Sequence, residues 1–140
     1  MKSVFSVLKL KTLIACFALT LLAAPVFAQV TMQFCHTVSP DNGAAEWPFN
    51  TITFVKDKPL KCVVYLSEAI PGLTYVTFKV QYRQNSEQPF VDKAFYKLDV
   101  QPDWLWFYYN LSFEMAGNYK VIILDNNDKP LTESMLYLVL

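Results

Sequence analysis

The chain has 140 residues, with twelve basic and twelve acidic side chains, 54% hydrophobic residues and 16% aromatic residues. The balanced charge excludes a nucleic-acid-binding protein that relies on a basic surface. The low charge and the high aromatic content exclude an intrinsically disordered chain.

The first 28 residues are typical of a cleaved secretory signal peptide. A charge-free apolar run over residues 12–22 is followed by small residues that lead to a cleavage site between Ala28 and Gln29. A positive segment precedes the run and contains Lys2, Lys9 and Lys11. Cleavage would leave residues 29–140, a length that suits a single domain, with a net charge of about −3 because three lysines are removed.

Two membrane-bound alternatives to cleavage are disfavoured. The apolar run is shorter than the roughly 20 residues of a transmembrane helix, and Pro25 interrupts it. Residues 13–16 are similar to a bacterial lipobox, but Lys9 and Lys11 leave almost no apolar run before Cys16. We therefore expect a secreted or periplasmic protein with no transmembrane anchor after signal cleavage.

Alternation of apolar and polar residues predicts about eight short strands and no amphipathic helix. In chain order the strands are residues 30–34, 51–55, 60–66, 75–83, 94–100, 104–113, 119–125 and 131–140. Turn-forming residues fill the gaps, and residues 36–50 form the longest predicted loop. Even spacing of about ten residues indicates an all-β protein in which two packed sheets bury their apolar faces.

Residues 111–140 resemble the last strands of an immunoglobulin-like or fibronectin-III-like module. Phe113 is followed by a glycine corner at Gly117, and Tyr119 opens the next strand before a closing hairpin over residues 126–130. The resemblance implies an antiparallel β-sandwich of seven to eight strands, in which this tyrosine buries its ring and returns its hydroxyl to the backbone. It implies no active site and no ligand, since unrelated functions share this fold.

Two cysteines remain after signal cleavage, and in an exported domain they predict one disulfide between Cys35 and Cys62. Such a bridge would stabilise the fold by roughly 3–4 kcal/mol. The alternation places Cys62 on an apolar face with Val64, whereas Cys35 shares a polar face with Gln33. Either Cys35 lies past the end of its strand or a bulge turns it to the other face.

The sequence contains no set of residues that predicts an enzyme, a metal site or a cofactor site. The single histidine, His36, follows Cys35 directly, and neighbours on a strand point to opposite faces. Two cysteines and one histidine do not complete a zinc site. Residues 125–128 lack the ligand spacing of a calcium loop and instead favour a hairpin turn.

The most distinctive surface candidate is a row of aromatic residues at alternate positions, Trp104, Trp106 and Tyr108. Both faces of this strand are apolar, and only one can meet the main core. Trp47 and the rest of the 36–50 loop could cover the second face, which is the favoured arrangement, or a partner protein or sugar rings could do so. Lys79 and Arg83 are candidate polar groups at the rim of this surface.

These observations favour an exported, non-enzymatic binding or interaction module that uses the Trp104, Trp106 and Tyr108 face, with Trp47. The first alternative is a carbohydrate-binding module that stacks sugars on the same rings. The second is a structural subunit that self-associates through strand 131–140, which is apolar on both faces. That strand is either central in its sheet, which is favoured, or an edge that pairs with another chain.

Overall fold

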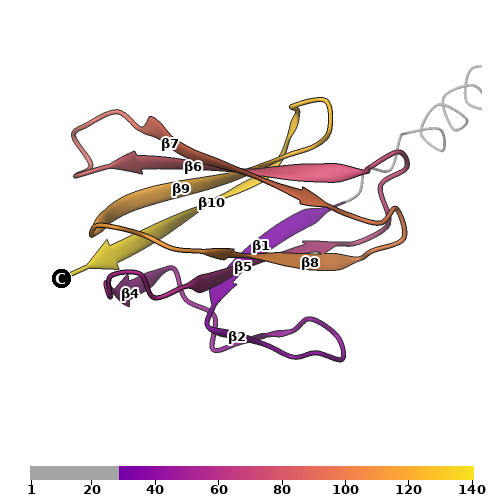
Figure 1. Ribbon diagram of the computed structural model, residues 1–140, viewed down its shortest axis with the longest axis horizontal. Helices are drawn as coiled ribbons and strands as arrows, with labels where there is room; N and C mark the ends of the chain where they lie inside the picture. Colours follow the sequence, from indigo (N-terminus) through magenta and orange to yellow (C-terminus); the bar gives the residue numbers. More distant parts are fainter. Residues whose placement is uncertain (1–28) are drawn as a thin grey trace, which may run out of the picture.

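A computed structural model describes residues 29–140; the predicted signal peptide lies outside these residues. The described part is all-β (Figure 1). Its strands are β1 (Val30–Cys35), β2 (Thr37–Val38), β3 (Ala45–Glu46), β4 (Thr51–Thr53), β5 (Leu60–Leu66), β6 (Tyr75–Arg83), β7 (Val91–Asp99), β8 (Trp106–Leu111), β9 (Gly117–Leu124) and β10 (Pro130–Val139). All eight predicted strands are present. The two additional strands, β2 and β3, form a short hairpin within the predicted 36–50 loop.

The strands form two facing layers, as the sequence predicted. One layer is a three-stranded sheet with the order β1-β5-β8, and the other is a five-stranded sheet with the order β4-β10-β9-β6-β7. Figure 1 shows the layers one above the other, with the β2 hairpin beneath the smaller sheet. All pairs within the two sheets are antiparallel except β4 with β10. Strand β10 lies between β4 and β9 and so inside its sheet, which is the arrangement that the sequence favoured for strand 131–140.

The core lies between the two inner faces and follows the alternation seen in the sequence. Val76, Phe78 and Val80 of β6 are buried and face the smaller sheet, where Phe34 and Phe107 lie. The Phe78 and Phe107 rings meet edge to face, with 6.4 Å between their centres. Because successive residues of a strand point to opposite sides, each long strand contributes one apolar side to this single core.

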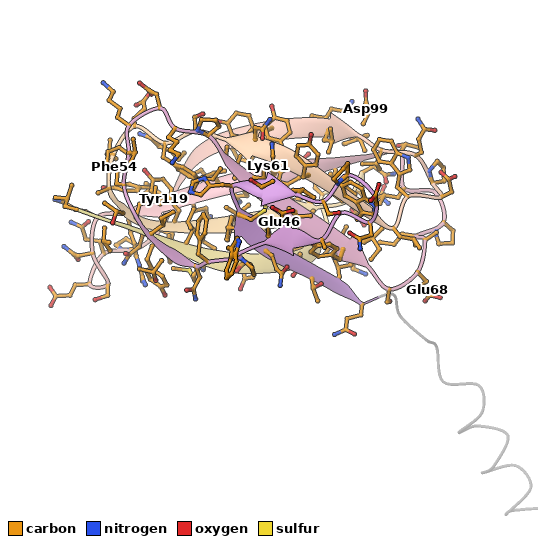
Figure 2. The ribbon with its side chains drawn as sticks, turned by 90° about the horizontal axis from the view of Figure 1, so that it is seen from below. Glu46, Phe54, Lys61, Glu68, Asp99 and Tyr119 are labelled. Atoms are coloured by element: carbon orange, nitrogen blue, oxygen red, sulfur yellow. The ribbon has the colours of Figure 1, made fainter. Side chains whose placement is uncertain are left out.

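Tyr119 forms the tyrosine corner that the family resemblance implied. Its side chain, labelled in Figure 2, is only 2% exposed. The Tyr119 hydroxyl donates a hydrogen bond of 2.8 Å to the carbonyl oxygen of Met115. The ring packs at 4.5 Å, centre to centre, from the ring of Phe113. This contact fixes the crossing from the smaller sheet into β9.

We expect Tyr119→Phe to lower the free energy of unfolding by about 1–2 kcal/mol at neutral pH, because the Met115 carbonyl loses its partner. Burial, with the nearby Tyr82 and Glu114, raises the pKa of Tyr119 from 10 to about 12. The folded chain holds this proton to a higher pH than the unfolded chain does. The stabilisation is therefore complete below pH 10 and falls as the pH rises towards 12, by at most about 3 kcal/mol. Urea unfolding from pH 8 to 11.5 should be less pH-dependent in the variant, and equal slopes would contradict this assignment.

The predicted disulfide between Cys35 and Cys62 is not formed, and both thiols are free and buried. Cys62 lies opposite Phe34 in the β1–β5 register, and Cys35 lies opposite Lys61. The two side chains therefore point to opposite faces of the sheet. Neither a bulge nor an early strand end was needed to bury Cys35, because residues 36–50 cross the outer face on which it lies.

We expect the 29–140 chain to contain two thiols that react with Ellman's reagent only after unfolding. Burial raises the pKa of both thiols and so disfavours the reactive thiolate. In guanidinium chloride without reductant, the two thiols should titrate fully, and the native protein should give less than about a tenth of that signal within minutes. If the unfolded chain contained no titratable thiols, the disulfide between Cys35 and Cys62 would be present after all.

Candidate functional site

The candidate site is a hollow beside β8, where β8 and β7 form the edges of their two sheets, and we call it the edge hollow. It has a volume of about 560 Å³. Its lining is mostly apolar and consists of Leu98, Asp103, Trp104, Leu105, Trp106, Phe107 and Tyr108. The structure thus brings the three predicted aromatic residues of this segment together in one site. The sequence pattern did not identify Leu98, which comes from β7 in the other sheet.

Backbone hydrogen bonds position the aromatic lining. A turn places Trp104, whose backbone N–H donates a 3.1 Å hydrogen bond to the carbonyl oxygen of Gln101. The next residue, Leu105, is held to β5 because its carbonyl oxygen accepts a 2.8 Å bond from the N–H of Leu66. Trp104 and Tyr108 are each 41% exposed, which is high for large aromatic side chains on ordered backbone. The site can therefore offer aromatic surface with little loss of conformational entropy on binding.

A stacked pair of tyrosines joins the two sheets next to the hollow. Tyr96 of β7 and Tyr109 of β8 have ring centres 5.2 Å apart and an interplanar angle of 25°. Tyr109 also packs at 5.3 Å from Phe78 in the core. The edges of the two sheets are thereby held at a set separation on this side.

The 36–50 segment covers part of the outer face of the smaller sheet, and Gly43 is the residue that meets Trp106. A Cβ atom at Gly43 would lie 2.1 Å from the Trp106 ring. Tyr65 of β5 holds the segment against the smaller sheet, because its hydroxyl donates to the Gly43 carbonyl oxygen at 2.8 Å and accepts from the Ala45 N–H at 2.9 Å. Cover from within the chain therefore exists for Trp106, but it leaves Trp104 and Tyr108 half exposed.

Trp47 does not provide this cover. Its side chain is 91% exposed, and it is not among the residues that line the edge hollow. Its φ of 52° places it in the left-handed region, which large side chains rarely adopt. The sequence assigned the right segment to the covering role but the wrong residue, since a glycine in a turn-rich stretch carries no packing signal.

One cation lies at the end of the aromatic row that is remote from Trp104. The Lys61 ammonium group lies 4.7 Å from the centre of the Tyr108 ring and 3.0 Å from the Asn110 side-chain oxygen. Figure 2 views this outer face with Lys61 and Glu46 labelled. Asp103 is the one acidic residue in the lining of the hollow, so the two ends of the row carry opposite charges.

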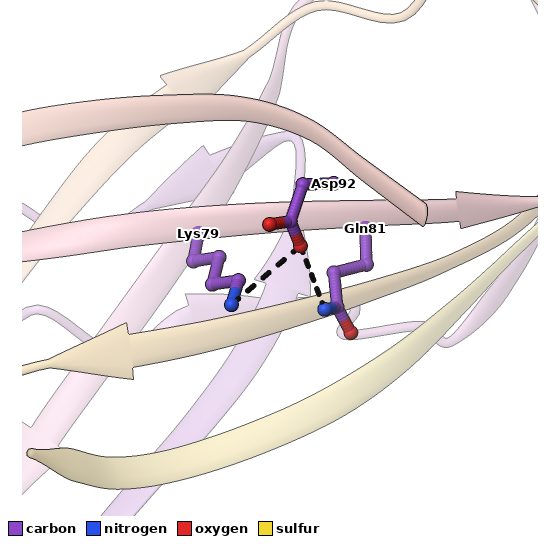
Figure 3. Close-up of polar contacts among 3 residues, drawn as sticks. All are labelled: Lys79, Gln81 and Asp92. Atoms are coloured by element: carbon purple, nitrogen blue, oxygen red, sulfur yellow. Dashed lines mark hydrogen bonds and ion pairs between the residues drawn. The ribbon is translucent and has the colours of Figure 1, made fainter. Parts of the chain in front are cut away.

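Lys79 and Arg83 do not form the rim of this site. Both lie on the outer face of the five-stranded sheet, where Lys79 pairs with Asp92 at 3.5 Å (Figure 3). Gln81 donates a 2.9 Å hydrogen bond to the same carboxylate, and this bond, ahead of Lys79, lowers the pKa of Asp92. Arg83 lies over the ring of Phe90. The expected rim assignment was wrong because alternation within β6 cannot show which sheet the aromatic strand joins.

Within residues 29–140, no three His, Cys, Asp or Glu side chains lie close enough together to hold a metal ion. The His36 ring packs at 5.2 Å from the ring of Phe49. The predicted turn at 125–128 is present, because the Asp125 carboxylate accepts hydrogen bonds from the N–H groups of Asn127 and Lys129. In the same part of the chain, no helix has the length and apolar character to cross a bilayer.

The three tryptophans of the chain should differ in solvent access in a set order. We expect variants that keep a single tryptophan, with phenylalanine at the other two positions, to be quenched by acrylamide most strongly for Trp47, less for Trp104 and least for Trp106. The emission maximum should move to shorter wavelength in the same order, because burial removes water from the indole. If Trp104 were quenched as weakly as Trp106, the edge hollow would be closed in solution.

Comparison with known proteins shows the fold and nothing finer. The structure is similar to that of an immunoglobulin-like protein from Pseudomonas aeruginosa, with a TM-score of 0.53 and 11% sequence identity. The match covers 83% of this chain and 99% of the other. No protein-family model and no curated protein sequence matches the chain. The prediction of an immunoglobulin-like β-sandwich is confirmed, and identity this low identifies no specific family within it.

Proposed function

We propose that this chain is an exported, non-enzymatic binding module that contacts its partner through the edge hollow. The observation that carries the proposal is an apolar hollow of about 560 Å³ in which Trp104 and Tyr108 are half exposed on hydrogen-bonded backbone. Exposed aromatic clusters of this kind are uncommon on monomers unless they serve recognition.

Export is the other half of the proposal. Its support is the arrangement of a positive start, an apolar run and a small-residue cleavage site in residues 1–28. The protein would then act as a secreted or periplasmic protein. Intact mass of the protein recovered from the exporting host should correspond to a chain that starts at Gln29, and a mass that includes residues 1–28 would count against export.

A binding role is favoured over catalysis by the state of the nucleophilic candidates. Both thiols are buried with raised pKa, and His36 is packed against a phenylalanine ring. General base catalysis requires a base within hydrogen-bonding reach of a substrate, and His36 does not line the edge hollow.

The proposal is tested by fluorescence titration of the 29–140 chain against a panel of soluble oligosaccharides and a panel of short extended peptides. We expect at least one probe to change the tryptophan emission, and we expect Trp104→Ala to abolish this change. Trp47→Ala is the matched control, because it removes a more exposed indole that lies outside the hollow. A probe that binds equally well to Trp104→Ala would place recognition elsewhere.

A carbohydrate-binding role is the second candidate, and Asp103 favours it. A carboxylate beside aromatic rings can accept hydrogen bonds from sugar hydroxyls while the rings stack on the sugar. For this role, Asp103→Asn and Trp104→Ala should each weaken binding of the same oligosaccharide. If no member of the oligosaccharide panel changes the emission of the wild-type protein, this candidate is removed.

A further inference from the structure

Strand β8 has one free edge along its whole length. It pairs with β5 and with no other strand of the described chain. Leu105 faces β5 through its carbonyl oxygen, so Phe107 and Tyr109 also direct their backbone groups towards β5. Because backbone groups alternate in an antiparallel strand, those of Trp106, Tyr108 and Asn110 point away from the sheet. Nothing else in residues 29–140 pairs with these groups.

This edge has none of the features that usually block pairing with another chain. From Trp104 to Phe113 the sequence contains no Asp, Glu, Lys, Arg or His. The register between β8 and β5 runs from Leu111 to Trp106 without a bulge. Charged residues, bulges and short length are the common means of protecting a free edge. A six-residue, uncharged and regular edge is therefore open to strand addition.

The other edges of the two sheets are partly occupied or carry blocking features. On the edge of β1, Phe49 pairs with Phe34 alone, because its N–H donates to the Phe34 carbonyl oxygen at 2.9 Å. Strand β4 has only three residues. Strand β7 carries four charged residues, and a bulge at Lys93 interrupts its register with β6. The part of β10 that β4 leaves unpaired contains Glu133. Strand β8 differs from β1 in that no residue of its outer edge has a backbone partner within residues 29–140.

We propose that the β8 edge binds an extended segment of a partner protein, which adds to the β1-β5-β8 sheet as a fourth, antiparallel strand. Its backbone would pair with the outward groups of Trp106, Tyr108 and Asn110, and an apolar side chain would enter the edge hollow. This inference rests on the proposed function and gives its partner a chemical class. A sugar could use the rings, but it would not match the regular spacing of the free backbone groups.

Charge at the two ends of β8 sets the expected polarity of the partner segment. Asp103 precedes the strand, and Lys61 reaches its far end beside Asn110. An antiparallel partner places its C-terminal end next to Asp103 and its N-terminal end next to Lys61. The complementary segment therefore has a basic residue at its C-terminal end, an acidic residue at its N-terminal end and alternating apolar residues between them.

The probe is the blocked peptide acetyl-Glu-Val-Thr-Val-Thr-Val-Arg-amide, titrated into isotope-labelled 29–140 protein and followed by backbone amide NMR. We expect the largest shift changes at Trp106, Tyr108 and Asn110. Two further peptides carry N-methyl groups, on the valines in one and on the threonines in the other. Only one of these sets faces β8, so one peptide should bind about tenfold or more weakly and the other should bind like the parent. Equal binding by all three peptides, or equal loss by both methylated ones, would overturn strand addition.

Asp103→Asn supplies the matched change on the protein. It should weaken the arginine peptide several-fold and leave a glutamine analogue of that peptide unaffected. If light scattering instead finds a concentration-dependent dimer with the same amide shifts and no peptide, the occupant is a second copy and the proposal is overturned.

Failure of this inference is distinguishable from failure of the proposed function. If the peptide does not bind while an oligosaccharide gives a Trp104-dependent change in emission, strand addition falls and the binding module remains. If neither probe binds and Trp104 is as protected from acrylamide as Trp106, both proposals fall together.

Discussion

Replacing Gly117 by alanine should lower the free energy of unfolding by about 2–5 kcal/mol. Gly117 has a φ of 146°, which L residues rarely adopt, and a Cβ atom there would lie 2.4 Å from the Tyr82 ring. Backbone strain and overpacking therefore act together at the start of β9. Tyr82 cannot easily give way, because its ring packs 5.1 Å from that of Tyr119 and its hydroxyl donates to the Ala116 carbonyl oxygen at 3.3 Å. Chemical denaturation at neutral pH measures the loss.

Gly72 provides the control for this experiment. Its φ is 77°, but no atom lies within 4 Å of the position that a Cβ would take. Gly72→Ala should therefore cost only the backbone term, about 1–2 kcal/mol. A second variant, Tyr82→Ala with Gly117→Ala, should lose less stability than the sum of the two single changes. Equal costs at Gly72 and Gly117 would show that contact with Tyr82 contributes nothing.

Gly43→Ala should detach the 36–50 segment from the sheet, at a cost of about 2–4 kcal/mol. The new methyl group would occupy the space of the Trp106 indole, and the φ of 70° adds strain. The segment can relieve the overlap by lifting away, which breaks the two hydrogen bonds to the Tyr65 hydroxyl. Trp106 emission in a single-tryptophan background should shift to longer wavelength, and proteolysis should begin within residues 36–50.

Trp106→Ala combined with Gly43→Ala separates the overlap from the strain. With the indole gone, the methyl group has space, so the added cost of Gly43→Ala should fall to that of Gly72→Ala. An unchanged emission maximum for Trp106 in the Gly43→Ala protein would mean that the ring, and not the segment, moves. The edge hollow would then change shape while the cover stayed in place.

The strands were predictable because the core follows local alternation. In β6 the residues Val76, Phe78 and Val80 alternate with polar neighbours, and each is buried as expected. The tyrosine corner was predictable for a different reason, since Phe113, Gly117 and Tyr119 carry a pattern that immunoglobulin-like modules share with other β-sandwiches. Both signals lie within a few consecutive residues.

The candidate site was only partly predictable. Trp104, Trp106 and Tyr108 formed a visible row, but Leu98 and Gly43 reach them from other parts of the chain and carry no local signal. Cysteine pairing failed for a related reason. The expectation that Cys35 and Cys62 bond came from their number and the export signal, whereas alternation in their strands already placed them on opposite faces. The local geometry was the better guide.

The path of residues 36–50 has a consequence for how the protein unfolds. The chain leaves β1 in the smaller sheet, crosses the outer face of that sheet, and enters the larger sheet at β4. There the backbone N–H of Tyr137 in β10 donates to the Asn50 carbonyl oxygen at 2.7 Å. One continuous stretch thus belongs to both layers. The layers cannot separate without breaking this stretch away from at least one of them, so the sandwich should lose its structure as one cooperative unit and not sheet by sheet.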